Sequence, residues 1–186
     1  MPKYTSITEI ENYLSIKIDS LLKTQVEEWI DSVENYIEKE TGRVFVADEE
    51  ASIRKYDGKN SKKLFIDDCI EITEVKVDDK VITDYLSYPA NKLPIMWLER
   101  ESRFPEGKQN ISVKAKWGYS KECPPEIKLA TTILTAGIVN YSESKGGDIQ
   151  SESYGSYSVT YKSEKQWNDF EQAKEIINRY KRILVG

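Results

Sequence analysis

The stretch PPEIKLATTILTAGIVNY, residues 124–141, decides the fold, because it predicts a helix that is apolar on two sides. Proline is tolerated in the first turn of a helix, so the proline pair suits its start. A surface helix has a single apolar stripe, so a helix with two stripes is packed from both directions and is central. One stripe consists of Ile127, Ala130, Leu134, Ile138 and Tyr141, and the other consists of Leu129, Ile133 and Ala136.

The two ends of the chain predict three further helices that can cover this central one. Ser6-Ile-Thr-Glu9 has capping-box spacing and opens a short helix. A second amphipathic helix follows and stops at Gly42, which suits a left-handed cap. Ser163-Glu-Lys-Gln166, another capping box, opens the last helix. The apolar residues of the three helices are Ile7, Ile10 and Leu14; Leu22, Val26, Trp29, Ile30, Val33 and Ile37; and Trp167, Phe170, Ala173, Ile176, Ile177, Tyr180 and Leu184.

Between residues 51 and 120 the pattern changes to that of short strands separated by polar turns. Turn residues gather at Asp57-Gly58 and Asn60, at Asp78-Asp79-Lys80, and at Phe104–Gly107. Each of the two aspartate pairs of this region is expected where a strand ends. The predicted strands are Ser52–Tyr56, Lys63–Ile66, Ile70–Val77, Val81–Tyr85, Ile95–Leu98 and Ile111–Trp117.

These elements predict an α+β fold. We expect a small bundle of about four helices, in which the N- and C-terminal helices pack together, with an inserted antiparallel β region. A chain of 186 residues is long enough for one domain with a proper core. We therefore expect a single domain over residues 1–186, with helical parts over about 6–42 and 125–186 and a β-rich insert over about 51–120.

Composition narrows the classes of function. The formal net charge is −5 and Lys greatly outnumbers Arg, which argues against a dedicated nucleic-acid surface. The chain has no histidine, which removes Ser-His and Cys-His nucleophile pairs and imidazole bases. Cys69 and Cys123 form no metal or redox motif. With no signal peptide and no apolar run that could span a membrane, we expect a soluble protein of a cytoplasm.

No pattern in the sequence predicts a catalytic site or a cofactor. Asp67-Asp68 and Asp78-Asp79 could hold a divalent cation, but polar turns explain them better. Ser153-Tyr-Gly-Ser156 lacks the histidine and the strand-to-helix turn of a nucleophile elbow. The aromatic residues that lie in or beside the predicted strands and loop have few basic neighbours, so they favour protein–protein contacts over stacking on single-stranded nucleic acid. They are Trp97, Trp117, Tyr119, Tyr154, Tyr157 and Tyr161.

The ordered set of segments resembles the head–tail connector proteins of tailed bacteriophages, also called adaptor or head-completion proteins. The resemblance covers nearly the whole chain and ends on a helix that contains Ile176–Leu184. The motifs that carry it, in chain order, are Thr41-Gly-Arg43-Val-Phe45, Tyr56-Asp-Gly58, Val113-Lys-Ala-Lys-Trp117-Gly-Tyr119, Pro124-Pro-Glu-Ile127-Lys-Leu-Ala130 and Ser153-Tyr-Gly-Ser-Tyr-Ser-Val159-Thr-Tyr161.

The resemblance implies a structural virion protein of the neck, which is assembled in the host cytoplasm and has no catalytic residues or cofactor. It implies a closed ring of about twelve copies below the portal protein. The ring would extend the DNA channel, let the genome pass without sequence-specific binding, and meet the next neck or tail-completion protein. The alternatives are another virion ring such as a tail-completion protein, a carboxylate-metal nuclease, or a cytoplasmic module that binds another protein.

We expect the last helix to carry the contact with the portal. It has an apolar stripe and basic residues towards its end, which suit the negative end of the helix dipole or an acidic partner. The alternative is that the stripe completes the subunit's own core. The predicted contact residues are Trp167, Phe170, Lys174, Ile177, Arg179, Lys181 and Arg182.

Residues 156–161, SYSVTY, alternate in the manner of a half-buried strand. The flanking segments predict helices, so we expect no local hairpin partner for this strand. It would then pair with a neighbouring copy on ring assembly or, as the alternative, with Ile111–Trp117 inside the subunit. The residues assigned to a neighbouring copy or to the channel are Gly146, Gly147, Tyr154, Tyr157, Val159 and Tyr161.

Overall fold

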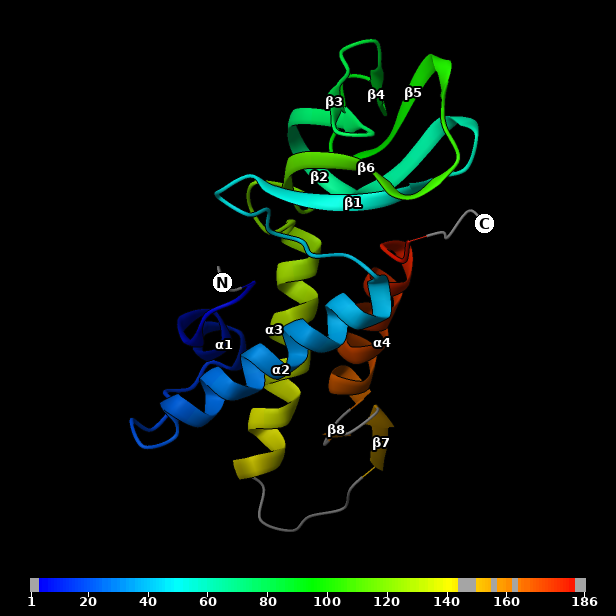
Figure 1. Cartoon of the computed structure of the whole chain (residues 1–186). Helices are drawn as coiled ribbons and strands as arrows, with labels where there is room; N and C mark the ends of the chain where they lie inside the picture. The colour runs from blue at the N-terminus through cyan, green and yellow to red at the C-terminus, as the bar shows by residue number, and fades with distance from the viewer. Residues whose placement is uncertain (1–3, 144–149, 155–156, 162–163, 183–186) are drawn as a thin grey trace. The chain divides into compact units, whose positions relative to one another are not determined.

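The computed structural model describes residues 4–143, 150–154, 157–161 and 164–182, and the side chains of residues 4–142 and 168–182. The chain divides into two compact units (Figure 1). The helical unit comprises Met1–Gly42 and Cys123–Gly186, and the β unit comprises Arg43–Glu122. Four helices and a six-stranded antiparallel sheet lie in the described part of the chain, so the predicted α+β class is confirmed.

The helical unit consists of α1 (Ile7–Leu14), α2 (Lys23–Thr41), α3 (Pro125–Glu143) and α4 (Glu164–Arg179). As its two stripes predict, α3 is central and contacts each of the other three helices. Figure 1 shows α2 crossing in front of α3, with α4 beside them. Most of the predicted stripe residues of α3 are buried, whereas Leu129 and Tyr141 are partly exposed.

The helix ends follow the predicted local chemistry. The Ser6 side chain accepts a hydrogen bond from the Glu9 backbone N–H at 3.3 Å and so caps α1. Gly42 follows α2 with a φ of 68°, a left-handed conformation that glycine adopts without strain. Its N–H donates to the Glu38 carbonyl at 2.8 Å, which closes the helix. The start of α1 and the end of α2 are therefore closed by the residues that the sequence predicts for these positions.

The strands of the β unit are β1 (Ser52–Gly58), β2 (Ser61–Val77), β3 (Lys80–Val81), β4 (Leu86–Tyr88), β5 (Ile95–Phe104) and β6 (Gly107–Trp117). They pair antiparallel in the order β1-β6-β2-β5-β4, and β3 pairs with β2. One face of this sheet forms the core of the unit. The core residues with the least exposure are Ile66, Cys69, Val75, Leu98, Phe104, Ile111, Val113, Ala115 and Trp117.

The length of β2 corrects the prediction for this region. One strand of 17 residues replaces the two predicted over Lys63–Ile66 and Ile70–Val77, so Asp67 and Asp68 lie inside a strand and not at a strand end. The physical reason is a change of partner, because β2 pairs with β5 between Ser61 and Cys69 and with β6 from Cys69 to Val77. Irregular register at this crossover accommodates the two aspartates.

Two further strand predictions differ from the structure. The turn cluster after Tyr56 does not make β1 and β2 a hairpin pair, because β1 pairs along its length with β6. The strand predicted over Val81–Tyr85 ends at Val81, and the next strand begins at Leu86. Turn residues indicate where a strand ends, but they do not indicate its partner, because strand pairing is set by contacts between residues far apart in the sequence.

The two chain ends of the β unit are tied to each other. Backbone hydrogen bonds join residues 44–48 to residues 117–120, including Tyr119 N–H to the Val44 carbonyl at 2.9 Å and Ala47 N–H to the Ser120 carbonyl at 2.9 Å. Gly118 has a φ of 142°, and a Cβ there would lie 2.4 Å from the Ala47 Cα. Only glycine allows the two segments to approach this closely.

The strand over residues 156–161 has a local partner, which corrects the prediction that it has none. β8 (Tyr157–Tyr161) pairs antiparallel with β7 (Gln150–Tyr154), and Tyr154 lies opposite Tyr157. The alternative pairing with Ile111–Trp117 is also wrong, because that segment of β6 pairs with β1 and β2. The two-residue Gly-Ser connection is itself a hairpin signal, so the sequence contained the evidence.

Across the part of the chain that the structure describes, no helix is long and apolar enough to cross a membrane.

Candidate functional site

The apolar stripe of α4 lies in the core of the helical unit. Phe170, Ala173, Ile176 and Ile177 are all buried, with at most 4% of their surface exposed. Phe170 and Ile177 were predicted to contact the portal, but both are buried in the helical unit. They therefore fit the alternative, in which the apolar stripe completes the subunit's own core. The side chain of Trp167 is not among those described.

The basic residues at the end of α4 and just beyond it contact α2 and α3. Lys181 pairs with Glu40 at 3.2 Å, and Arg179 pairs with Glu126 at 3.1 Å. The Arg182 backbone N–H donates to the carbonyl of Thr41 at 2.8 Å. These ion pairs are half-exposed, so each contributes little to stability, but they leave charged groups on the surface for a partner.

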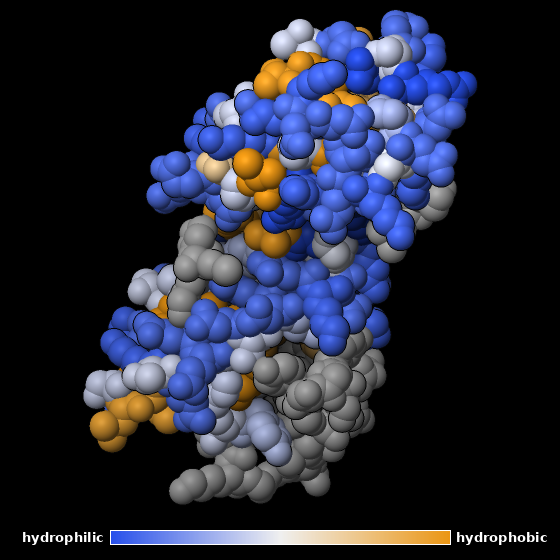
Figure 2. Space-filling model, viewed as in Figure 1, coloured by the Kyte–Doolittle hydropathy of each residue, from blue (hydrophilic) through white to orange (hydrophobic). Residues whose placement is uncertain are grey.

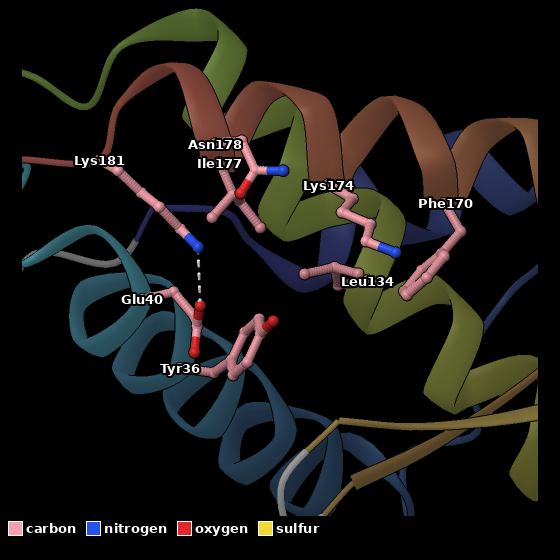
Figure 3. A pocket seen from close by; sticks show the side chains of 8 residues that line it. All are labelled: Tyr36, Glu40, Leu134, Phe170, Lys174, Ile177, Asn178 and Lys181. Atoms are coloured by element: carbon pink, nitrogen blue, oxygen red, sulfur yellow. Dashed lines mark ion pairs between the residues drawn. The ribbon is translucent and has the colours of Figure 1, made fainter.

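A small pocket opens between α2, α3 and α4 (Figure 3). Its volume is about 90 Å³. The floor is apolar, whereas charged and amide groups from α2 and α4 surround the opening. The lining residues are Tyr36, Glu40, Leu134, Phe170, Lys174, Ile177, Asn178 and Lys181.

The pocket brings together Lys174 and Lys181, which the sequence analysis had assigned to the portal contact on the basis of charge alone. Both side chains lie on the side of α4 that faces α2 (Figure 3). Lys174 also pairs with Glu171 at 3.7 Å, one turn earlier on the same helix. No pattern in the sequence predicts a pocket here, because Tyr36 and Glu40 come from the opposite end of the chain.

Asp67 and Asp68, which were considered as metal ligands, each form an ion pair with a different arginine of the β unit. Asp67 pairs with Arg54 at 2.8 Å and accepts a hydrogen bond from Tyr56 at 3.1 Å. Asp68 is buried and pairs with Arg43 at 2.6 Å. Within the described ranges no three His, Cys, Asp or Glu side chains converge to hold a metal ion. The two aspartates therefore act as partners of arginines in the fold.

The two thiols are poorly suited to act as nucleophiles. Burial raises the pKa of the Cys69 thiol to about 12, and it raises the pKa of the Cys123 thiol to about 12 as well. Burial also raises the pKa of the Tyr56 hydroxyl, which contacts Asp67. Because a thiol reacts as the thiolate, both cysteines remain in the unreactive form near neutral pH.

A row of aromatic side chains lies on the sheet face opposite the core of the β unit. Trp97 pairs across strands with Phe65 on one side and Tyr88 on the other, and it stacks on Tyr88 with 5.4 Å between ring centroids. Phe65 remains about half exposed. The sequence analysis had selected Trp97 for protein contact but missed its two neighbours, because strand pairing was unknown. By contrast, Trp117, also selected, is a core residue.

The negative charge is concentrated at one end of the chain. Residues 1–42 contain nine acidic and four basic residues, whereas residues 43–186 contain 23 of each. The exposed side of α2 presents Glu27, Glu28 and Asp31. Figure 2 shows this part of the surface as mainly hydrophilic, with apolar atoms at the loop that precedes α2. The helical unit is therefore the acidic part of the protein.

Several predicted contact residues cannot be placed as side chains. Gly146 and Gly147 lie outside the described residues. The backbone of Tyr154, Tyr157, Val159 and Tyr161 belongs to the β7–β8 hairpin, which contacts α3 and α4 through β8. Their assignment to a neighbouring copy or to the channel stays a prediction.

The described residues of the two units form no catalytic constellation, and they expose aromatic, apolar and acidic surfaces. Exposed aromatic and apolar side chains suit contacts with other proteins. Residues 3–183 match the family model described as head completion protein. The chain therefore belongs to the head completion protein family. The predicted family, the structural head–tail connector role and the virion setting are thereby confirmed.

Solved structures of the same fold come from gene transfer agent (GTA) particles. A chain in the neck of an empty GTA particle, computed with C6 symmetry, has a TM-score of 0.61 and is 12% identical, with 97% of this chain and 91% of that chain covered. A chain in the neck of a native GTA particle, computed with C12 symmetry, has a TM-score of 0.54 at the same identity and coverage. No curated protein matches the chain.

Proposed function

We propose that about twelve copies of this protein form a closed ring between the portal and the tail of a phage-type virion, and that the ring extends the DNA channel. The observation that carries this proposal is the head completion match over residues 3–183. The likeness to neck chains in structures computed with C6 and C12 symmetry supports a cyclic arrangement. The two units together form one connector subunit.

The charge distribution supports a conduit for DNA. A lumen that passes a genome must not hold its phosphates, and acidic groups repel them. The acidic surplus of residues 1–42 and the exposed carboxylates of α2 supply such groups. The ring acts as a structural part without enzymatic activity, since the arginines beside Asp67 and Asp68 already compensate these carboxylates.

The contact with the portal lies at the basic end of α4, through Arg179 and Arg182. This end is exposed at Arg179 and contains no apolar core residue beyond Ile177 in the described range. The β7–β8 hairpin contributes to the contact between copies, because in the described residues its two strands pair only with each other. Such a hairpin can accept a further strand along its edge.

The ring is tested by measuring the mass of the purified protein by analytical ultracentrifugation at rising concentration, with and without the portal protein of the same particle. We expect a discrete species of about twelve copies, formed more readily on the portal. The variant Arg179→Glu should lower portal binding and leave the mass of the free ring unchanged. A monomer under every condition, or Mg²⁺-dependent cleavage of DNA by the protein, would contradict the proposal.

A further inference from the structure

β1 has the longest open strand edge in the described part of the chain (Figure 1). In the sheet order β1-β6-β2-β5-β4, the strands β6, β2 and β5 have a neighbour on each side, whereas β1 and β4 lie at the ends. β4 has three residues and is followed by Pro89, and β3 has two residues, so neither offers a long edge. β1 pairs with β6 in regular register from Ser52 to Tyr56 and leaves its other side open.

The open side of β1 presents backbone groups to a further strand. An edge strand leaves the N–H and C=O groups of alternate residues without a strand partner. Outside the β6 pairing, the Trp117 indole N–H donates to the Ser52 carbonyl at 2.9 Å. Proteins often shield such an edge with charges, which here are Arg54 and Lys55. Two cations repel a like strand, but they accept an acidic one.

The positive charge of this edge is only partly compensated within the chain. Arg54 donates to Asp67 at 2.8 Å, yet the arginine side chain remains 41% exposed. A guanidinium has five N–H donors, so Arg54 can bind a second carboxylate. Lys55 has no ion pair in the described residues, and its neighbours Asp57 and Lys114 carry opposite charges. The edge therefore attracts a strand that carries a carboxylate.

β7 is the strand edge that matches β1. In the described residues β7 and β8 pair only with each other, and β8 contacts α3 and α4, so β7 is the outer strand of the hairpin. β7 has five residues, as many as the regular stretch Ser52–Tyr56. Its one charged residue, Glu152, is central, as Arg54 is in β1. Full pairing therefore places Glu152 opposite Arg54 in either strand direction.

We propose that β7 of one copy pairs along the open edge of β1 in the next copy and so extends the sheet across the subunit boundary. This inference rests on the proposed ring and names the strands of its repeating contact. Two different edges of one chain form a contact that repeats from copy to copy, as a closed ring requires. Pairing of two like edges would put Arg54 opposite Arg54, or Glu152 opposite Glu152, and would stop at a dimer.

The pairing is tested first on the unaltered protein by hydrogen–deuterium exchange below and above the concentration of ring assembly. Amides in residues 52–56 and 150–154 should exchange at least about tenfold more slowly in the ring, because new strand hydrogen bonds protect them. Residues 86–88 of β4, at the other end of the sheet, are the internal control and should keep their rate. Protection of residues 86–88 in place of 52–56 would overturn the proposal.

Cysteine pairs identify the partner and the strand direction. In a Cys123→Ser background, with the buried Cys69 in place, Ile53→Cys should cross-link to Ser153→Cys if the strands are antiparallel and to Ser151→Cys if they are parallel. One of these two double variants should give a covalent ladder up to the full ring, and each single variant should give none. A disulfide within one chain, or dimers from Ile53→Cys alone, would contradict the proposed contact.

The central charge pair is tested through the protein concentration at half-assembly. Glu152→Lys should raise this concentration about fivefold, because it places a cation opposite Arg54. Glu175→Lys makes the same change of charge at an exposed position of α4 and should leave the concentration nearly unchanged. In an Arg54→Gln background Glu152→Lys should lose most of its effect. An equal effect in both backgrounds would contradict the predicted register.

The outcomes separate this contact from the ring itself. Rings that have the native mass, but show no protection of residues 52–56 and no cross-link from either double variant, would overturn the strand contact and leave the ring intact. A native protein that forms no ring, alone or with the portal, would overturn both proposals.

Discussion

The helical unit and the β unit are built from the chain in opposite ways. The β unit is one continuous segment, Arg43–Glu122, whose ends are tied together by its own backbone hydrogen bonds. The helical unit joins Met1–Gly42 to Cys123–Gly186 across the whole length of that insertion. The contacts that stabilise the β unit therefore lie within one segment, whereas the helical unit depends on packing around α3 between segments far apart in the sequence.

Removal of residues 164–186 should produce the largest difference in stability between the helical unit and the β unit. It deletes α4 and exposes the face of α3 that α4 covers. Burial of Phe170, Ile176 and Ile177 contributes about 1.5–3 kcal/mol each, a sum comparable with the whole stability of many domains. We expect the helical unit to lose cooperative unfolding while slow hydrogen exchange persists in residues 43–122.

The control for this truncation is the isolated segment 43–122. It should fold alone and unfold at nearly the same urea concentration as the β unit of the full chain. An unfolded 43–122 segment would contradict the independent stability of the β unit. Amides of α2 and α3 that stay protected in the truncated chain would contradict the dependence of the helical unit on α4.

A second test lies inside the β unit, where two arginine–aspartate pairs differ in burial. The side chains of Arg43 and Asp68 are 12% and 5% exposed, and Oδ1 of Asp68 has no hydrogen-bond partner among the described residues. Arg43→Ala therefore leaves a buried charge without its cation and should cost about 3 kcal/mol in urea unfolding. This change should affect the β unit and leave the helical unit unchanged.

The matched variant is Arg54→Ala, which breaks the half-exposed pair with Asp67. It should cost about 1 kcal/mol or less, including the loss of the Arg54 contact with the Trp117 ring. Equal losses for the two arginines would show that burial does not distinguish the pairs. The double variant Arg43→Ala with Asp68→Ala should recover part of the loss.

The same contrast explains which parts could be predicted from the sequence. Helix periodicity and caps are local, so α3 was placed at the centre from its two stripes and α2 was ended at Gly42. Strand pairing is not local, so the pairing of β1 with β6 and the continuous β2 could not be read from turn signals. The β7–β8 hairpin was missed although its Gly-Ser connection was visible.

The interaction surfaces were predicted less well than the fold. Charge and amphipathicity predicted a portal contact on α4. They did not distinguish Phe170 and Ile177, which lie in the core, from Lys174 and Lys181, which line a pocket. The 89% exposure of Leu21 was not predicted either, because a leucine next to an apolar helix start is read as core. Exposure depends on which residues pack against a position, and a periodic pattern does not contain that information.

The smallest expected effect is a stabilisation at the turn between β2 and β3. Asp78 and Asp79 connect paired strands with φ values of 48° and 62°, so both adopt the left-handed conformation of a two-residue hairpin turn. Glycine adopts this conformation without the strain of a Cβ, although it loses more backbone entropy on folding, so Asp79→Gly should stabilise the β unit by about 1 kcal/mol or less in urea unfolding. Lys80→Gly, in the adjoining strand, is the control and should destabilise the unit, because glycine weakens a strand. If both variants destabilised equally, the turn would be held by its surroundings rather than by local backbone preference. The helical unit should keep its unfolding midpoint in both variants, since the change lies within the segment that stabilises itself.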